Sequence, residues 1–209
     1  KEGGVPPEAV TSGLAMTKIT FKKALRYAQK MHAGQTRAGG MPVWHHLLRV
    51  SETLGTILKE TGEGSVAERK IIPIAALGHD ILEDTKATQE EVGSVFGERG
   101  LELIRGMTNW LGDKNHGPYI KAMAAAEEAV RLIKLADSFD NFTSVAYNLT
   151  LLGEKWAYSY FLPIVLPMRQ KIFKTRFVTY KKTAEKLMFL VDTGWNLLRA
   201  ELEENKKKT

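Results

Sequence analysis

The sequence predicts an all-α protein, a compact array of about eight to ten helices. Apolar residues recur at helical spacing over most of the chain, and residues that commonly cap helices precede several of these stretches. The sequence has no strand-length alternation of apolar and polar residues, no Asn-Gly hairpin and no repeat of fixed period. The expected helical segments, in order, are residues 19–32, 44–58, 66–77, 88–96, 100–110, 118–149, 154–177 and 184–204.

Capping residues and glycines set the expected ends of the first segments. Thr17 or Thr20 can cap the first helix, because a hydroxyl accepts a hydrogen bond from a free backbone N–H. Thr88 followed by Glu91 is a capping-box pattern, and Gly97 is expected to end the helix that it starts. These signals predict short, well-delimited helices in the N-terminal half.

Three features modify the remaining segments. Gly62 is expected to end the second segment, and the third is expected to continue through Leu77 into the polar stretch that follows. Pro163 and Pro167 should interrupt or kink the segment 154–177, because each proline removes a backbone donor.

The length of 209 residues is sufficient for one well-cored domain. We expect this domain to cover residues 17–205. Residues 1–16 are rich in glycine and proline near their start and are expected to be a flexible lead-in, while residues 206–209 form a charged tail.

Composition excludes several kinds of site. The chain has no cysteine, which rules out disulfides, zinc–thiolate sites, iron–sulfur clusters and cysteine nucleophiles. No apolar run is long enough to span a bilayer and no secretion signal is visible, so a cytoplasmic protein without membrane contact is expected. The net charge of +6 could suit nucleic acid or an anionic nucleotide equally well, and part of the excess lies in lysine clusters expected at solvated helix ends. Charge alone therefore does not decide between these ligands, and nucleic acid is the least favoured option.

The stretch GHDILEDT, residues 78–85, directly follows an apolar run. Helical spacing places His79 over Glu83 and Asp80 over Asp84, so that four polar groups share one wedge. Burying such groups is costly unless they have a partner. A metal ion is the partner that we predict.

Two further polar residues lie within apolar helical stretches, His46 and Asp137. Together with His79 and Asp80 they would supply two nitrogens and two oxygens, a set suited to a divalent transition metal such as manganese or iron. Glu83 or Asp84 could then take a proton from a metal-bound water. The expected reaction is metal-assisted hydrolysis of a phosphate ester or anhydride.

The order His46, His79-Asp80, Asp137 resembles the H…HD…D pattern of HD-domain metal-dependent phosphohydrolases, whose fold is all-α. Four ordered motifs between residues 19 and 145 resemble, more specifically, the RelA/SpoT alarmone hydrolase domain, and the overall likeness is to its stand-alone small hydrolases. The motifs are HAGQTRAGGMP with His46, HDILEDT, the FG…GMT segment 96–108, and KLAD with Asn141.

This resemblance implies a manganese-dependent hydrolase that removes pyrophosphate from the 3′ position of ppGpp or pppGpp. It implies that His46, His79, Asp80 and Asp137 bind the metal and that Glu83 and Asp84 activate the water. The expected substrate contacts are Arg37, which would pack against guanine, Lys134, Asn141 and Ser144. A homo-oligomer and a functional link to an alarmone synthetase remain open.

The chain departs from the family pattern at Ala38, Ser138, Asp140 and Ser144. These positions are expected to affect the nucleotide pocket and not the metal ligands. Two alternatives therefore stay open: hydrolysis of another nucleotide, such as an NADPH phosphatase activity, and an inactive alarmone-binding protein. The complete set of ligands and acids argues against the second.

Structural explanations are sufficient for most of the other histidines and for the tryptophans. His32 is equally compatible with a helix end and with a substrate contact, whereas His45 and His116 are expected to be structural or solvated. The four tryptophans, at positions 44, 110, 156 and 195, are expected to belong to the core.

Overall fold

The computed structural model of the chain describes residues 19–37, 39–110, 116–149 and 151–208. Within these ranges all regular structure is helical, apart from one antiparallel bridge between Thr36 and Pro42. The predicted all-α class is confirmed. The predicted lead-in, Thr17 and Ala38 lie outside the described ranges. Across the described part of the chain, no helix combines the length and the apolar character needed to traverse a bilayer.

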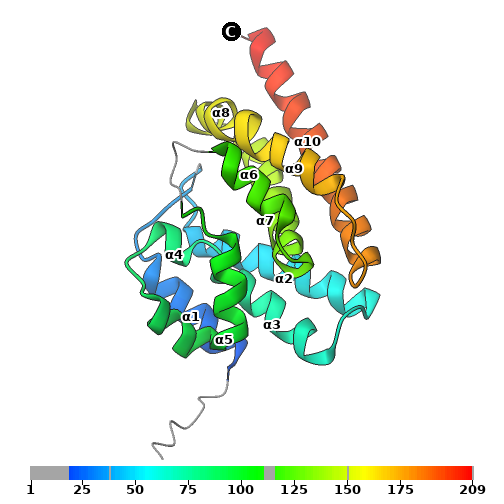
Figure 1. Cartoon of the computed structure of the whole chain (residues 1–209). Coiled ribbons are helices and arrows are strands. Elements are labelled where there is room, and N and C mark those ends of the chain that lie inside the picture. The colour runs from blue at the N-terminus through cyan, green and yellow to red at the C-terminus, as the bar shows by residue number, and fades with distance from the viewer. Residues whose placement is uncertain (1–18, 38, 111–115, 150, 209) are drawn as a thin grey trace, which may run out of the picture.

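The helices of the N-terminal half are α1 (Phe21–Met31), α2 (Val43–Thr61), α3 (Val66–Ala76), α4 (Ile81–Asp84) and α5 (Gln89–Met107). They are followed by α6 (His116–Ala125), α7 (Glu128–Tyr147), α8 (Leu151–Trp156), the π-helix η1 (Ala157–Val165), α9 (Leu166–Phe173) and α10 (Lys181–Lys208). In Figure 1, α1, α3, α4 and α5 gather at one end of the molecule and α6, α8 and α9 at the other. The long α10 packs along α7 and also contacts α2.

Helix α7 is the centre of the fold. Its buried residues lie on every face and include Leu132, Ile133, Leu135 and Ala136. A helix that is buried all round is in the interior of a domain. Any charged side chain on such a helix needs a partner within the protein, or a ligand, to offset the loss of hydration.

The predicted caps of the early helices are present. The Thr20 hydroxyl accepts a hydrogen bond from Lys23 N at 3.2 Å at the start of α1. Thr88 and Glu91 form the full capping box of α5. Gly62 ends α2 with φ +69°, a left-handed conformation that glycine adopts without steric cost.

The third helix ends earlier than predicted. α3 stops at Ala76, and the HD motif lies on a turn that leads into the single turn of α4. His79 Nδ1 lies 2.8 Å from the Ala76 carbonyl and thus takes the acceptor that a continuing helix would use. Gly78 allows the tight approach, because a Cβ there would lie 2.6 Å from Ile104 and 2.9 Å from Phe96.

Other boundaries also differ from the prediction. The expected segment 118–149 is divided between α6 and α7, and the segments 88–96 and 100–110 are merged into α5 with a kink at Gly97, where φ is +74°. The segment 154–177 is interrupted as expected, but its central nine residues form a π-helix that contains Pro163. α10 continues to Lys208, into the segment expected to be a charged tail.

Candidate metal and nucleotide site

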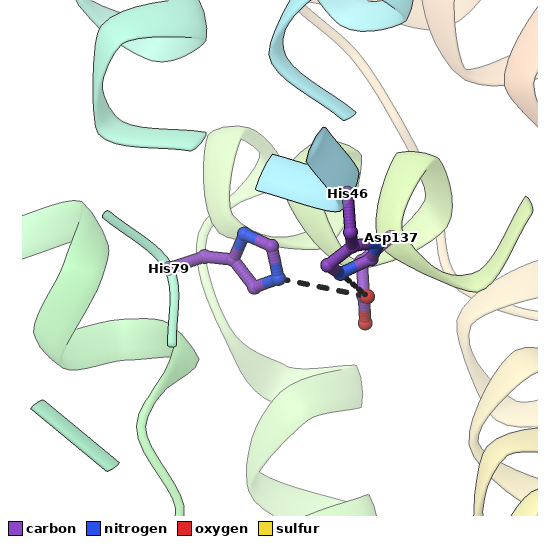
Figure 2. Close-up of side chains that lie close together, drawn as sticks. All are labelled: His46, His79 and Asp137. Atoms are coloured by element: carbon purple, nitrogen blue, oxygen red, sulfur yellow. Dashed lines mark ion pairs between the residues drawn. The ribbon is translucent and has the colours of Figure 1, made fainter. Parts of the chain in front are cut away.

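Three elements bring together the four residues predicted to bind a metal. His46 lies in the first turn of α2, His79 and Asp80 on the turn before α4, and Asp137 in the middle of α7. Figure 2 shows both imidazoles directed at the Asp137 carboxylate. His46 Nε2 lies 3.2 Å and His79 Nε2 3.6 Å from Asp137 Oδ1. Asp80 Oδ2 completes the cluster at 3.2 Å from His79 Nε2 and 3.9 Å from His46 Nε2.

The donor atoms of this cluster fit a divalent cation. One ligand atom each from His46, His79 and Asp137 can be chosen so that all three lie within 4.8 Å of one another. His79 Nδ1 donates to a backbone carbonyl, which leaves the Nε2 of a neutral ring as an electron-pair donor. The Nε2 atoms of both histidines are buried and have no hydrogen-bond partner. Such unpartnered atoms, directed at carboxylates, are what a metal would use.

The cluster also attracts positive charge electrostatically. Burial alone would lower the pKa of His79, but Asp80 and Asp137 raise it by more than burial lowers it, so that its pKa lies well above the ordinary value. Burial likewise would raise the pKa of Asp137, but Lys134 and the two histidines hold it well below the usual range. The carboxylates are therefore charged and draw a cation, either a proton or a metal ion, toward the imidazoles.

The two other acids of the motif lie beside the cluster on α4. Glu83 Oε2 accepts a hydrogen bond from Asn109 N at 3.1 Å, and burial raises the pKa of Glu83. Burial, together with the charges of Asp80 and Glu83, raises the pKa of Asp84 to about 6. Carboxylates with raised pKa values are the stronger bases, which suits proton transfer near neutral pH.

These residues line a polar cavity of about 410 Å³. Asp80, Asp137, Glu83 and Asp84 form part of its wall, and so do three of the expected substrate contacts, Arg37, Lys134 and Asn141. Ser144, the fourth, instead lines a neighbouring cavity of about 400 Å³, which shares Arg37 and Trp156 with the first. A ligand that reaches from one cavity into the other would pass Arg37.

Polar contacts connect Arg37 to the cluster. The Arg37 guanidinium donates to Asn141 Oδ1, and Asn141 Nδ2 donates to Asp137 Oδ1 at 2.7 Å. Arg37 also lies over the Trp156 ring, 5.0 Å from its centroid. Lys134 Nζ binds the other carboxylate oxygen of Asp137 at 2.8 Å. Two of the expected substrate contacts, Lys134 and Asn141, thus hold the Asp137 carboxylate in place.

Sequence reasoning missed several residues of the cavity. Trp156, expected to be core, lines both cavities, and Trp110, also expected to be core, is 57% exposed. His116, expected to be structural or solvated, lines the first cavity, the one that holds Asp80 and Asp137, together with Tyr160 of η1. An apolar helical pattern does not distinguish an aromatic ring in the core from one that lines a cavity, so the sequence contained no signal for this placement.

One expectation about the departures from the family pattern is wrong. None of them was expected to touch a metal ligand, but the Asp140 carboxylate lies 2.7 Å from His46 Nδ1. α7 presents Asp140 one turn after Asp137, so that both carboxylates face α2. The chain therefore departs from the pattern beside a candidate metal ligand and not only in the expected nucleotide pocket.

His32, whose role was left open, is buried near the cluster. Its Nδ1 lies 2.7 Å from Gln35 Oε1, and Gln35 in turn donates to the Asp84 carbonyl at 2.9 Å. Its Nε2 is buried without a hydrogen-bond partner, like those of His46 and His79. Burial lowers the pKa of His32, which favours the neutral ring. His32 is thus more than a helix-end residue.

Comparison with known proteins gives the family. The HD-domain family model matches residues 24–140. A GTP pyrophosphokinase of Myxococcus xanthus is 32% identical over 137 residues, which cover 60% of this chain but only 17% of that protein. Guanosine-3′,5′-bis(diphosphate) 3′-pyrophosphohydrolase MESH1 of Drosophila melanogaster is 33% identical over 133 residues, which cover 61% of this chain and 70% of the fly protein.

A solved structure shows the same fold. It is described as a metazoan ortholog of SpoT that hydrolyses ppGpp, and it superposes with a TM-score of 0.63 at 24% identity, covering 92% of this chain and 97% of the other. The family match spans the four clustered residues and the acids of α4. The chain therefore belongs to the HD-domain family, in the group of RelA/SpoT-type hydrolase domains that includes the fly protein.

Proposed function

We propose that this chain is a metal-dependent 3′-pyrophosphohydrolase of ppGpp and pppGpp that acts in the cytoplasm and releases GDP or GTP together with pyrophosphate. The observation that carries this proposal is the cluster of two buried imidazoles and two carboxylates, whose carboxylates line a polar cavity together with Glu83 and Asp84. The name of the fly relative states the same activity for that protein.

His46, His79, Asp80 and Asp137 would hold the metal, for which manganese is our expectation and ferrous iron the alternative. When bound, the ion lowers the pKa of a water and offsets charge on the phosphoryl oxygens. Glu83 or Asp84 would accept the proton of the attacking water, and the other would orient that water, since both line the cavity and both have raised pKa values.

The two adjoining cavities suit a nucleotide with phosphates at one end and a base at the other. The 3′-pyrophosphate would occupy the first cavity, beside Lys134 and the two carboxylates of the cluster. Arg37 stands between the cavities, with its guanidinium held by Asn141 and Trp156, and a planar cation in this position can stack on a purine. Ser144 would contact the base from the second cavity. An alarmone synthetase, which makes the substrate, is the functional partner that we expect.

The test is pyrophosphate release from ppGpp, measured with and without Mn²⁺, with NADPH and GTP assayed in parallel. We expect Mn²⁺-dependent release with GDP as the other product. Asp80→Ala should abolish Mn²⁺ binding and release together, whereas Glu98→Ala, which removes an exposed carboxylate on α5, should change neither.

Other outcomes would point to the alternatives. Phosphate release from NADPH in place of pyrophosphate release from ppGpp would refute the substrate but keep the hydrolytic site, and would direct attention to Arg37, Asn141 and Ser144, which line the two cavities. Tight ppGpp binding without any turnover would identify a binding protein. Full activity of Asp80→Ala after removal of metal would contradict the site itself.

A further inference from the structure

The Asp140 carboxylate bridges a metal-binding candidate and an arginine. Its Oδ2 lies 2.7 Å from His46 Nδ1, and it forms a bidentate pair with Arg49, through Oδ1 to Nε at 2.6 Å and Oδ2 to Nη2 at 2.9 Å. The His46 side chain is fully buried and that of Asp140 is 8% exposed. The contact joins α2 to α7 across 94 positions of the sequence.

This contact fixes which nitrogen of His46 faces the cluster. An ionised carboxylate can only accept, so His46 Nδ1 carries the hydrogen and donates it to Asp140. Nε2 of the neutral ring then keeps its electron pair, and this atom is buried without a partner, 3.2 Å from Asp137 Oδ1. The bidentate pair with the Arg49 guanidinium offsets the charge of the Asp140 carboxylate and fixes it in position.

The two histidines of the cluster are held by different kinds of acceptor. His79 Nδ1 donates to the neutral carbonyl of Ala76, whereas His46 Nδ1 donates to a carboxylate that is itself bound to a guanidinium. A charged acceptor makes a shorter, stronger hydrogen bond and increases the electron-donating strength of the ring. His46 is therefore the more strongly oriented of the two. This support comes from Asp140, one of the four positions at which the sequence departs from the RelA/SpoT pattern.

We propose that Asp140 is a positioning residue for the metal site: it orients His46 as a ligand through Nε2, and Arg49 holds Asp140 in place. The inference rests on the proposed function, because it presupposes that His46 binds a metal. It adds to the proposed site a carboxylate–histidine–metal arrangement, with one proposed ligand and one supporting residue on each of α2 and α7.

The test is the dissociation constant of Mn²⁺, measured by titration of the metal-free protein with detection of free Mn²⁺ by electron paramagnetic resonance. Asp140→Asn should weaken Mn²⁺ binding by about 10- to 100-fold, the usual effect of losing such a supporting group. Asp140→Glu should recover part of the affinity. Arg49→Gln, which leaves the carboxylate present, should weaken binding in the same direction but less. Glu98→Gln, which removes an exposed charge on α5, away from both cavities, should leave it unchanged.

Folding is monitored by circular dichroism, so that loss of structure is not mistaken for loss of affinity. If Asp140→Asn does not fold, Arg49→Gln decides, because the Arg49 side chain is 43% exposed. Folded variants that bind Mn²⁺ with wild-type affinity, even at a lower melting temperature, would show a purely structural role and overturn the inference. If the wild-type chain binds no Mn²⁺, the proposed metal site fails and this inference fails with it.

Discussion

Replacement of Lys134 by methionine should make the stability of the fold depend on metal. Lys134 Nζ lies 2.8 Å from Asp137 Oδ2, and the two side chains are only 6% and 5% exposed. Burial lowers the pKa of Lys134, but Asp137 raises it by more, so the pair is fully charged. Lys134→Met keeps the length of the side chain and removes the charge that compensates Asp137 in the interior.

The magnitude follows from the cost of an unpaired buried charge. Breaking a buried ion pair by removing one partner costs about 3–5 kcal/mol. For a chain of this size each kcal/mol corresponds to about 2–4 °C, so the melting temperature of the metal-free protein should fall by about 6–20 °C. With saturating Mn²⁺ the loss should be smaller, because the ion supplies positive charge to Asp137. By linkage, the variant should bind Mn²⁺ more tightly than the wild type.

The assay is thermal unfolding followed by circular dichroism, for wild type and variant, with and without Mn²⁺. Lys121→Met is the matched control, because it makes the same substitution at an exposed position of α6, and we expect no significant shift. An equal loss of stability with and without Mn²⁺ would refute the reasoning, since it would mean that the ion does not reach Asp137. An unchanged melting temperature of the metal-free variant would show that the ion pair contributes little.

Two further predictions concern other carboxylates. Glu83→Gln should retain Mn²⁺ affinity but lower kcat by about 10²–10⁴-fold. The ion pairs described for the cluster join His46 and His79 to Asp80 and Asp137 and do not include Glu83, and the amide can still accept from Asn109 N. Parallel loss of metal would instead make Glu83 a ligand. Glu63 accepts from Lys182 N at 2.9 Å and Thr183 N at 2.8 Å at the start of α10. Burial raises the pKa of Glu63, but these bonds lower it by more. The stability that Glu63 contributes is therefore fully present above its pKa in the unfolded chain, about 4.3. It is lost as the pH falls through its lower pKa in the folded protein. Glu63→Gln should reduce the melting temperature at neutral pH by about 2–4 °C, corresponding to about 1 kcal/mol. In thermal scans this difference should vanish in strong acid, and a difference independent of pH would contradict the assignment.

Local signals in the sequence predicted much of the fold. A capping box needs only two side chains three residues apart, so Thr88 and Glu91 sufficed to place the start of α5. The break after Ala76 could not be predicted in this way. Apolar periodicity extends through Leu77, and the turn depends on the close approach of Ile104 and Phe96 to Gly78, which is a tertiary contact.

The same distinction between local signals and tertiary contacts applies to the candidate site. His46, His79, Asp80 and Asp137 were found because each is polar within an apolar stretch and because their order matches a known pattern. The role of Asp140 was missed because its partners, His46 and Arg49, are more than 90 positions away, and only the packing of α7 on α2 brings them together. Trp156 was assigned to the core for the related reason that no local pattern records a neighbouring cavity.

Two separate segments of the chain form the wall of the first cavity, the one that holds Asp80 and Asp137. The side that carries the metal-binding candidates lies within the HD-domain match, residues 24–140, whereas Trp156, Ser159 and Tyr160 come from α8 and η1, beyond that match. A π-helix is rare and is often found at functional sites. Substitutions in this second segment can change which nucleotide the cavity admits while leaving the metal-binding atoms in place. Part of the substrate choice can thus change without a change in the candidate metal-binding residues, although Arg37 and Lys134 lie in the first segment.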